Sequence, residues 1–234
     1  MKKYFFLMIF MTIVFGICSR SFSENRELKI VAFGDSITYG TGDPLQQGYV
    51  GRLVEKLEEK IPSVYVKNYG VPKYTTEDIL RILRKRQALK SIRQANYITL
   101  FIGTNDFRQS VNYQFNRLPK EKLERGKRRY LANLHKTLEV IRANNPHAPM
   151  IVMGLYHPYV EYDNQKEIFD TIEDWNIEVN TVTQDFQQTY FLPTADLFLI
   201  HEKKQCFSDS LHPNAYGYDL LSNRVSEKIM TLEL

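Results

Sequence analysis

The stretch Val31-Ala32-Phe33-Gly34-Asp35-Ser36-Ile37-Thr38-Tyr39 is the starting point for interpreting the chain. The apolar run from Leu28 to Phe33 is typical of a strand buried on both faces, and it ends abruptly at Gly34. Ser36 would then lie just past the carboxyl end of that strand, where open α/β sheets bind their ligands. A serine hydroxyl is a poor nucleophile until a base takes its proton. The stretch therefore raises the question of whether the chain supplies a base, an orienting acid and donors for an oxyanion.

Outward from this stretch, short apolar runs alternate with segments of helical spacing. Further strands are predicted at residues 64–66, 97–102, 150–155 and 190–192. Helices are predicted at 49–61, from Thr75 or Thr76 to 83, at 127–143, at 166–188, and from Pro213 or Asn214 onward. Residues 107–126 are polar and aromatic, and we expect a connection there.

The alternation predicts an α/β domain with helices on both faces of a parallel sheet. We expect three layers, α/β/α, around five strands in the flavodoxin-like order 2-1-3-4-5. In that order the carboxyl ends of the first three strands meet, and these ends carry Ser36, Gly70 and Asn105. The predicted fold therefore gathers candidate catalytic groups at one edge of the sheet.

The length and charge of the chain limit the classes of function. Its 234 residues fit one α/β domain with a sizeable core. The formal net charge is +4, but Lys2, Lys3 and Arg20 carry three of these charges, which leaves +1 for the residues from 24 onward. We see no electrostatic reason to expect nucleic acid as a partner.

The first 23 residues resemble a targeting segment. Lys2 and Lys3 precede an uninterrupted apolar stretch from Tyr4 to Cys18, which is short for a membrane span. We expect residues 1–23 to be a signal peptide or N-terminal membrane anchor and residues 24–234 to form the folded domain. The domain would then act outside the cytoplasm, secreted or anchored to a membrane.

The processing of this leader is left open by the sequence. Ser21-Phe22-Ser23 fits a cleavage site before Glu24. Cys18 offers the alternative of a lipid-modified cysteine, but Phe15-Gly16-Ile17 matches a lipoprotein signal poorly. The remaining cysteine, Cys206, cannot form an internal disulfide once the leader is removed, and we expect a small buried side chain.

The histidines are the candidates for the base that Ser36 needs. Of the five, His135 is predicted in a helix and His147 in a Pro-rich turn. His157 and His201 are predicted in loops at strand ends. His212 differs because Asp209 precedes it by three residues in a short loop. Such an acid can hold one ring nitrogen and leave the other free for the serine, although Asp-x-x-His also arises by chance.

Donors for a developing oxyanion are also available. Donors aimed at this charge matter greatly, because losing one costs roughly 100- to 1000-fold in rate. A glycine such as Gly70 lets a main-chain N–H approach a substrate closely, Asn105 offers a side-chain N–H, and the N–H of Ser36 is a third donor. Taken singly, Gly70 and Asn105 also fit ordinary turn residues.

Taken together, these residues resemble the SGNH, or GDSL, hydrolase family, in its exported bacterial form. The matching blocks run in order through the chain from Leu28 to its end: Gly34-Asp35-Ser36, Gly70 after Asn68, Gly103-Thr104-Asn105-Asp106 and Asp209-Ser210-Leu211-His212. The resemblance implies Ser36 as nucleophile, His212 as base, Asp209 as its partner, and Ser36, Gly70 and Asn105 as oxyanion donors. One departure is Val71-Pro72-Lys73-Tyr74, where many members have a further glycine, so this loop should be shaped differently.

The resemblance implies a serine ester hydrolase that uses no metal or cofactor, with Asp35 and Asp106 bracing their loops. The sequence also has no Gly-x-Ser-x-Gly elbow, HExxH motif or P-loop. A segment with aromatic and basic residues follows the asparagine block: Phe107, Arg108, Tyr113 and Phe115. It fits a flap that covers lipid acyl chains close to a membrane and meets a phosphate head group, and it fits a solvated surface loop equally well.

Export and this flap favour a lipase or lysophospholipase acting on small-molecule or lipid esters. Two alternatives remain open at this point. One is an O-acetyl esterase acting on cell-wall or extracellular glycan. The other is a binding or assembly module that keeps the fold without turnover.

Overall fold

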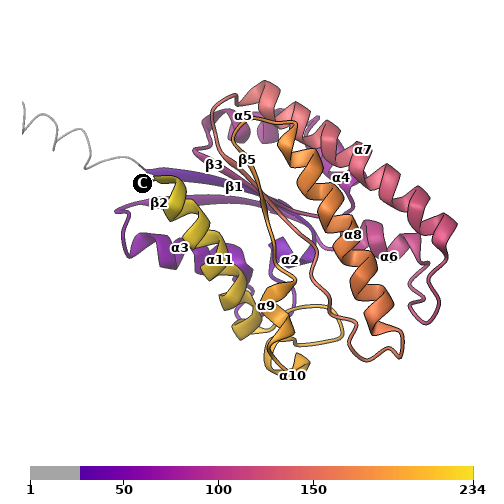
Figure 1. Cartoon of the computed structure of the whole chain (residues 1–234). Helices are drawn as coiled ribbons and strands as arrows, with labels where there is room; N and C mark the ends of the chain where they lie inside the picture. Colours follow the sequence, from indigo (N-terminus) through magenta and orange to yellow (C-terminus); the bar gives the residue numbers. More distant parts are fainter. Residues whose placement is uncertain (1–26, 234) are drawn as a thin grey trace, which may run out of the picture.

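The computed structural model describes residues 27–233 and is built on one five-stranded sheet (Figure 1). All strand pairs are parallel, and the order is β2-β1-β3-β4-β5, which confirms the predicted order. The strands are β1 (Leu28–Gly34), β2 (Val64–Gly70), β3 (Tyr97–Phe101), β4 (Met150–Met153) and β5 (Thr189–Leu192). The predicted leader, residues 1–23, lies outside the described residues.

Helices cover both faces of this sheet (Figure 1). They are α2 (Ser36–Tyr39), α3 (Gly48–Glu58), α4 (Thr76–Ile82), α5 (Arg86–Gln94), α6 (Thr104–Ser110), α7 (Lys120–Asn144), α8 (Gln165–Gln184), α9 (Asp196–Leu199), α10 (Lys203–Cys206) and α11 (Ala215–Glu233). Helices α4, α5, α7 and α8 pack on one face, and α3 and α11 pack on the other. Within residues 27–233, no helix combines the length and the apolar character that a membrane span requires.

The alternation of side chains along β1 explains the two layers of core. Val31 and Phe33 belong to the cluster under α4, α5, α7 and α8, whereas Ile30 and Ala32 belong to the cluster under α3 and α11. Because successive strand residues point to opposite faces, an apolar run of this kind is stable only when both faces are covered. The sheet is therefore a rigid, buried platform whose carboxyl edge presents the loops.

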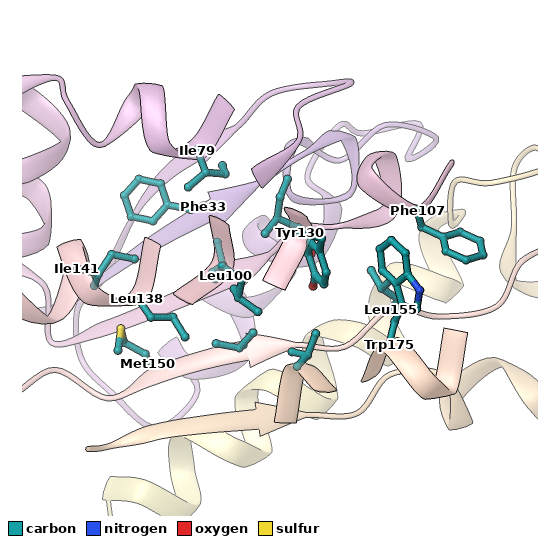
Figure 2. Packing of buried hydrophobic residues seen from close by; sticks show 14 of the residues in the cluster. Phe33, Ile79, Leu100, Phe107, Tyr130, Leu138, Ile141, Met150, Leu155 and Trp175 are labelled. Atoms are coloured by element: carbon teal, nitrogen blue, oxygen red, sulfur yellow. The ribbon is translucent and has the colours of Figure 1, made fainter. Parts of the chain in front are cut away.

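The segment after β3 differs from the sequence-based expectation. Where we expected a connection over residues 107–126, the chain forms α6 and then begins α7 at Lys120, seven residues before the predicted start. Gly126 allows the two helices to approach closely, because a methyl group there would overlap the Ser110 side chain. Figure 2 shows Trp175 in the core between Phe107 of α6 and Tyr130 of α7.

Candidate active site

Ser36 lies where the first strand leaves the sheet. Asp35 caps the short helix α2, because its Oδ1 accepts a hydrogen bond from the Ile37 N–H at 2.9 Å. This cap makes Ser36 the first residue of the helix, and only 6% of its surface is exposed. Gly34 is required here, since any β-carbon would overlap Thr38 and the Phe101 carbonyl. The serine is thus held by a short turn rather than by a flexible loop.

The structure brings His212 and Asp209 to this serine from the other end of the chain. His212 Nε2 lies 3.1 Å from Ser36 Oγ, and His212 Nδ1 lies 2.7 Å from Asp209 Oδ2. Because Nδ1 faces a carboxylate, it carries the proton, and Nε2 is left to accept the Ser36 hydroxyl proton. The three side chains therefore form a continuous relay of hydrogen bonds.

The loop before α11 holds Asp209 in its charged form. Asp209 Oδ1 accepts hydrogen bonds from the main-chain N–H groups of Leu211 and His212, each at 2.7 Å. Partial burial raises the pKa of Asp209, but these hydrogen bonds and the His212 ring outweigh it, so the pKa lies below its ordinary value. Tyr156 fixes the loop from the sheet side, since its hydroxyl donates to the Leu211 carbonyl at 2.8 Å.

Asn105 lies in the first turn of α6, at the end of β3. Its Nδ2 donates to the Tyr74 carbonyl at 2.9 Å, which uses one of its two amide hydrogens. The preceding Gly103 has φ 128, a value that favours glycine and allows the strand to turn sharply into the helix. The amide is therefore oriented by the loop after β2, on the same edge of the sheet as Ser36.

Gly70 has a different role from the one expected. Its N–H donates to Asn68 Oδ1 at 2.7 Å, so it is not offered to a substrate. Asn68 Nδ2 in turn donates to the Thr38 carbonyl at 2.8 Å. A β-carbon at Gly70 would lie 2.6 Å from Thr38 C and overlap the Tyr39 N. Gly70 is therefore a glycine because β2 packs directly on the backbone of α2.

The absence of a second glycine after Gly70 is reflected in the backbone conformation of the loop that follows it. Lys73 has φ 70, a left-handed conformation that is unusual for a residue with a β-carbon. Tyr74, which follows it, closes a turn by donating its N–H to the Val71 carbonyl at 3.2 Å. The expectation that this loop is shaped differently thus has a concrete form, a strained lysine beside the residue that holds Asn105.

The two acids of the motif blocks are buried and occupy different environments. Asp106 ties α6 to α4, because it accepts hydrogen bonds from Thr76 Oγ1 at 2.6 Å and Thr76 N–H at 3.0 Å. Burial raises its pKa to about 6 despite these bonds. Asp35 Oδ2 has no hydrogen-bond partner within residues 27–233. Burial raises the pKa of Asp35 to about 7, and the neighbouring carboxylate of Asp106 adds to the rise.

The predicted flap is wrong for its two phenylalanines. Phe107 and Phe115 are 1% and 4% exposed, and Phe107 packs edge-on against Trp175 with ring centroids 5.3 Å apart (Figure 2). Phe107 belongs to the core because α6 turns this side inward, and Phe115, which follows α6, stacks on Tyr159 with ring centroids 4.1 Å apart. Tyr113 is 53% exposed, and Arg108 lies under its ring, 5.1 Å from the centroid. Arg108 is therefore partly exposed beneath an outward-facing Tyr113, whereas the two phenylalanines point into the core.

The other histidines are not hydrogen-bonded to Ser36 in the described part of the chain. His157 is buried, and together with His201 it lines a groove between the start of α8 and α9. His135 is near Asp185 on the surface. Cys206 is 1% exposed, as expected for a small buried side chain.

Comparisons with known proteins agree with this architecture. A model of the GDSL-like lipase/acylhydrolase family matches residues 32–220. The uncharacterized protein YpmR of Bacillus subtilis is 30% identical over 209 residues, which cover 87% of this chain and 82% of that protein. The spore germination lipase LipC of Bacillus licheniformis is 25% identical over 205 residues, which cover 85% of this chain and 94% of LipC.

A solved structure has the same fold. The lipase Lip_vut3 from a goat rumen metagenome superimposes with a TM-score of 0.76 and covers 86% of this chain and 96% of its own. The two sequences are 23% identical, so the likeness concerns the fold.

Proposed function

The chain belongs to the GDSL-like lipase/acylhydrolase family, and from this premise we propose that it hydrolyses carboxylic esters with Ser36 as its nucleophile. His212 is the general base, and Asp209 orients its ring. The observation that carries the proposal is the unbroken relay from Ser36 Oγ to His212 Nε2 at 3.1 Å and from His212 Nδ1 to Asp209 Oδ2 at 2.7 Å. A serine needs this arrangement before it can attack an acyl carbon.

The reaction runs in two halves. Ser36 Oγ bonds to the ester carbonyl carbon while its proton moves to His212 Nε2. The tetrahedral intermediate collapses, its bond to the alcohol oxygen breaks, and His212 returns the proton to the leaving alcohol. Water then attacks the acyl-enzyme with His212 again as base, and the acid leaves as Ser36 recovers its proton.

The negative charge on the intermediate rests on donors at the edge of the sheet. We assign these to the N–H of Ser36 and to the Asn105 side chain, whose second amide hydrogen is not needed for Tyr74. Gly70 is left out, because its N–H is used by Asn68.

The decisive experiment is Ser36→Ala with a short-chain nitrophenyl ester. We expect turnover to fall by roughly 10⁴-fold or more, because the nucleophile is removed while the fold is kept. A fluorophosphonate probe should label the wild type and not the variant. Activity near the wild-type level in Ser36→Ala would end the proposal, and a wild type that resists labelling at neutral pH would favour a binding module.

We further propose that the natural substrate is a lipid ester met outside the cytoplasm. The leader-like residues 1–23 and the name of the relative LipC support this choice. Rates on acyl chains of two, eight and sixteen carbons should rise with chain length. A flat or falling profile, with efficient release of acetate from an acetylated sugar, would instead identify an O-acetyl esterase.

A further inference from the structure

Arg108 lies on the same side of α6 as the proposed oxyanion donor. It follows Asn105 by three residues in the helix Thr104–Ser110, and residues at this spacing are neighbours on a helix surface. Its charge reaches the start of α2, where burial raises the pKa of Asp35 and Arg108 acts in the opposite direction. Arg108 therefore shares a helix face with Asn105, and its charge is close enough to act on Asp35, the residue before Ser36.

Among the described residues this half-buried arginine is in no salt bridge, although its charge acts on the buried Asp35 carboxyl. Its Nε is buried without a hydrogen-bond partner in the same part of the chain. A buried donor that is left unpaired is costly, and such groups in folded proteins call for an explanation.

The turn that follows this arginine has an unfavourable backbone conformation. Asn112 and Tyr113 both adopt left-handed φ values, 51 and 59. The Tyr113 N–H donates to the Arg108 carbonyl at 2.9 Å, and the Tyr113 ring covers the guanidinium at 5.1 Å. Strained non-glycine residues of this kind persist where the surrounding structure imposes them, often at ligand sites. The left-handed turn at these residues places the Tyr113 ring over the Arg108 guanidinium.

A second donor without a partner lies nearby. Tyr159 is 5% exposed, and its hydroxyl is buried with no hydrogen-bond partner among the described residues. Burial raises the pKa of Tyr159 far above neutrality, so the phenol keeps its proton, and the charge of Arg108 acts on it in the opposite direction. The nearby carboxylate of Glu161 is already paired with Lys203 at 2.6 Å. The Tyr159 ring lies 6.3 Å from that of Phe107, the residue before Arg108, so the two donors without partners come from neighbouring parts of the structure.

We propose that Arg108 and Tyr159 bind a phosphate group carried by the alcohol part of the ester cleaved at Ser36. The guanidinium fork matches two oxygens of such an anion, and the phenol supplies a donor for a third. A neutral ester would leave the arginine unpaired. The inference rests on the proposed esterase function and narrows its substrate to phosphate-bearing esters.

The test compares two soluble esters that differ only in charge, octanoyl glycerol phosphate and octanoyl glycerol. The wild type should prefer the phosphate ester in kcat/KM. Arg108→Gln should lower this preference by roughly 10- to 100-fold, as expected for hydrogen bonds to a charged group, mainly through KM. Tyr159→Phe should lower it by a smaller factor.

Arg117→Gln is the matched control. Arg117 is exposed in the connection between α6 and α7 and forms no ion pair within the described residues, so its loss removes the same charge from a nearby part of the chain. The substrate preference should stay at the wild-type value in this variant. A drop as large as that of Arg108→Gln would overturn the proposal, because general electrostatics would then explain the preference.

Further outcomes separate this inference from the esterase itself. Equal preference in the wild type and Arg108→Gln would overturn the phosphate site while the esterase stands. A wild type that prefers an octanoyl ester with a carboxylate in place of the phosphate would also overturn it. If Arg108→Gln does not fold, as judged by circular dichroism, the same ratio in Tyr159→Phe decides.

Inorganic phosphate provides a measurement that does not depend on turnover. It should bind the wild type in calorimetry, and binding should weaken at least roughly tenfold in Arg108→Gln. If every ester resists hydrolysis while this binding is observed, the esterase proposal fails and the anion site survives. Phosphate binding without any preference for the phosphate ester would mean that the site takes the free ion, which overturns its role in substrate binding.

Discussion

Two regions flank Ser36 at the carboxyl edge of the sheet, and they differ in how their polar atoms are paired. In the loop that carries His212, both oxygens of Asp209 accept hydrogen bonds at 2.7 Å. In the region around α6, Arg108 Nε and the Tyr159 hydroxyl have no partners within residues 27–233. The paired loop fixes catalytic geometry before a substrate arrives, whereas the unpaired region keeps capacity for a ligand.

Asp35 lies between these regions and shares features of both. Its Oδ1 is paired with the Ile37 N–H, and its Oδ2 is buried without a partner in the described part of the chain. The comparison therefore predicts different consequences for carboxylates on the two sides. Replacing the paired Asp209 should stop catalysis. Replacing the unpaired Asp35 by a neutral residue should make the folded state more stable at high pH.

The largest expected effect is on the paired side, in Asp209→Asn. An asparagine whose NH2 group faces His212 Nδ1 cannot accept a hydrogen bond from the Nδ1–H, so the ring changes tautomer and Nε2 no longer accepts from Ser36. We expect kcat for a nitrophenyl ester to fall by roughly 10³- to 10⁴-fold, a barrier increase of about 4–5 kcal/mol. Steady-state kinetics on a variant with a wild-type circular dichroism spectrum would measure this.

A matched control is Asp170→Asn, which removes an exposed carboxylate of α8 that pairs with Lys166. It should leave kcat within twofold of the wild type, about 0.4 kcal/mol. A loss of less than about tenfold in Asp209→Asn would contradict the view that this loop fixes the catalytic geometry.

The second effect is on the unpaired carboxyl, in Asp35→Asn. Burial gives Asp35 a pKa of about 7 in the folded protein against an ordinary value of 3.8. Folding favours the protonated form of Asp35. The contribution of this carboxyl to the free energy of unfolding is therefore complete below about pH 4 and is lost as pH rises through 7. The loss reaches up to about 4 kcal/mol at 1.36 kcal/mol per unit. Asparagine stays neutral, so the variant should escape this loss.

Urea denaturation at pH 5 and pH 8 measures the difference. The wild type should lose more stability than Asp35→Asn between these values, and the variant should be the more stable protein at pH 8. Asp170→Asn should follow the wild-type pH dependence, because Asp170 is exposed. Parallel pH profiles for the wild type and Asp35→Asn would show that the unpaired carboxyl carries no such cost.

The same contrast explains what the sequence could predict. The strand order followed from local apolar runs and their alternation with helices, and so did the meeting of Ser36 and Asn105 at one edge. The placement of His212 against Ser36 followed from the family resemblance of the motif blocks, since the loop before α11 gives no such signal by spacing alone. Signals of this kind are contained in short stretches of sequence, so they can be recognised without a structure.

The errors arose where a residue's role depends on tertiary packing. Phe107 and Phe115 occur among charged residues, and they turn inward only in the assembled fold, where Phe107 packs on Trp175 and Phe115 stacks on Tyr159. The early start of α7 could have been found, because Leu123, Gly126 and Tyr130 extend its buried stripe towards Pro119. The missing partners of Arg108 and Tyr159 had no signal at all, since an unpaired atom is a property of the assembled fold.

Gly70→Ala should give the smallest of these effects. It tests whether the region of fixed, hydrogen-bonded geometry around Ser36 includes the end of β2. A β-carbon there must push back Thr38 and Tyr39, the last two residues of α2. Overpacking of this kind costs roughly 1–3 kcal/mol in stability. Since α2 begins with Ser36, we expect kcat to fall together with the melting temperature. The new side chain keeps the Gly70 N–H, so full stability with lost activity would instead point to a direct role of residue 70 in binding the oxyanion.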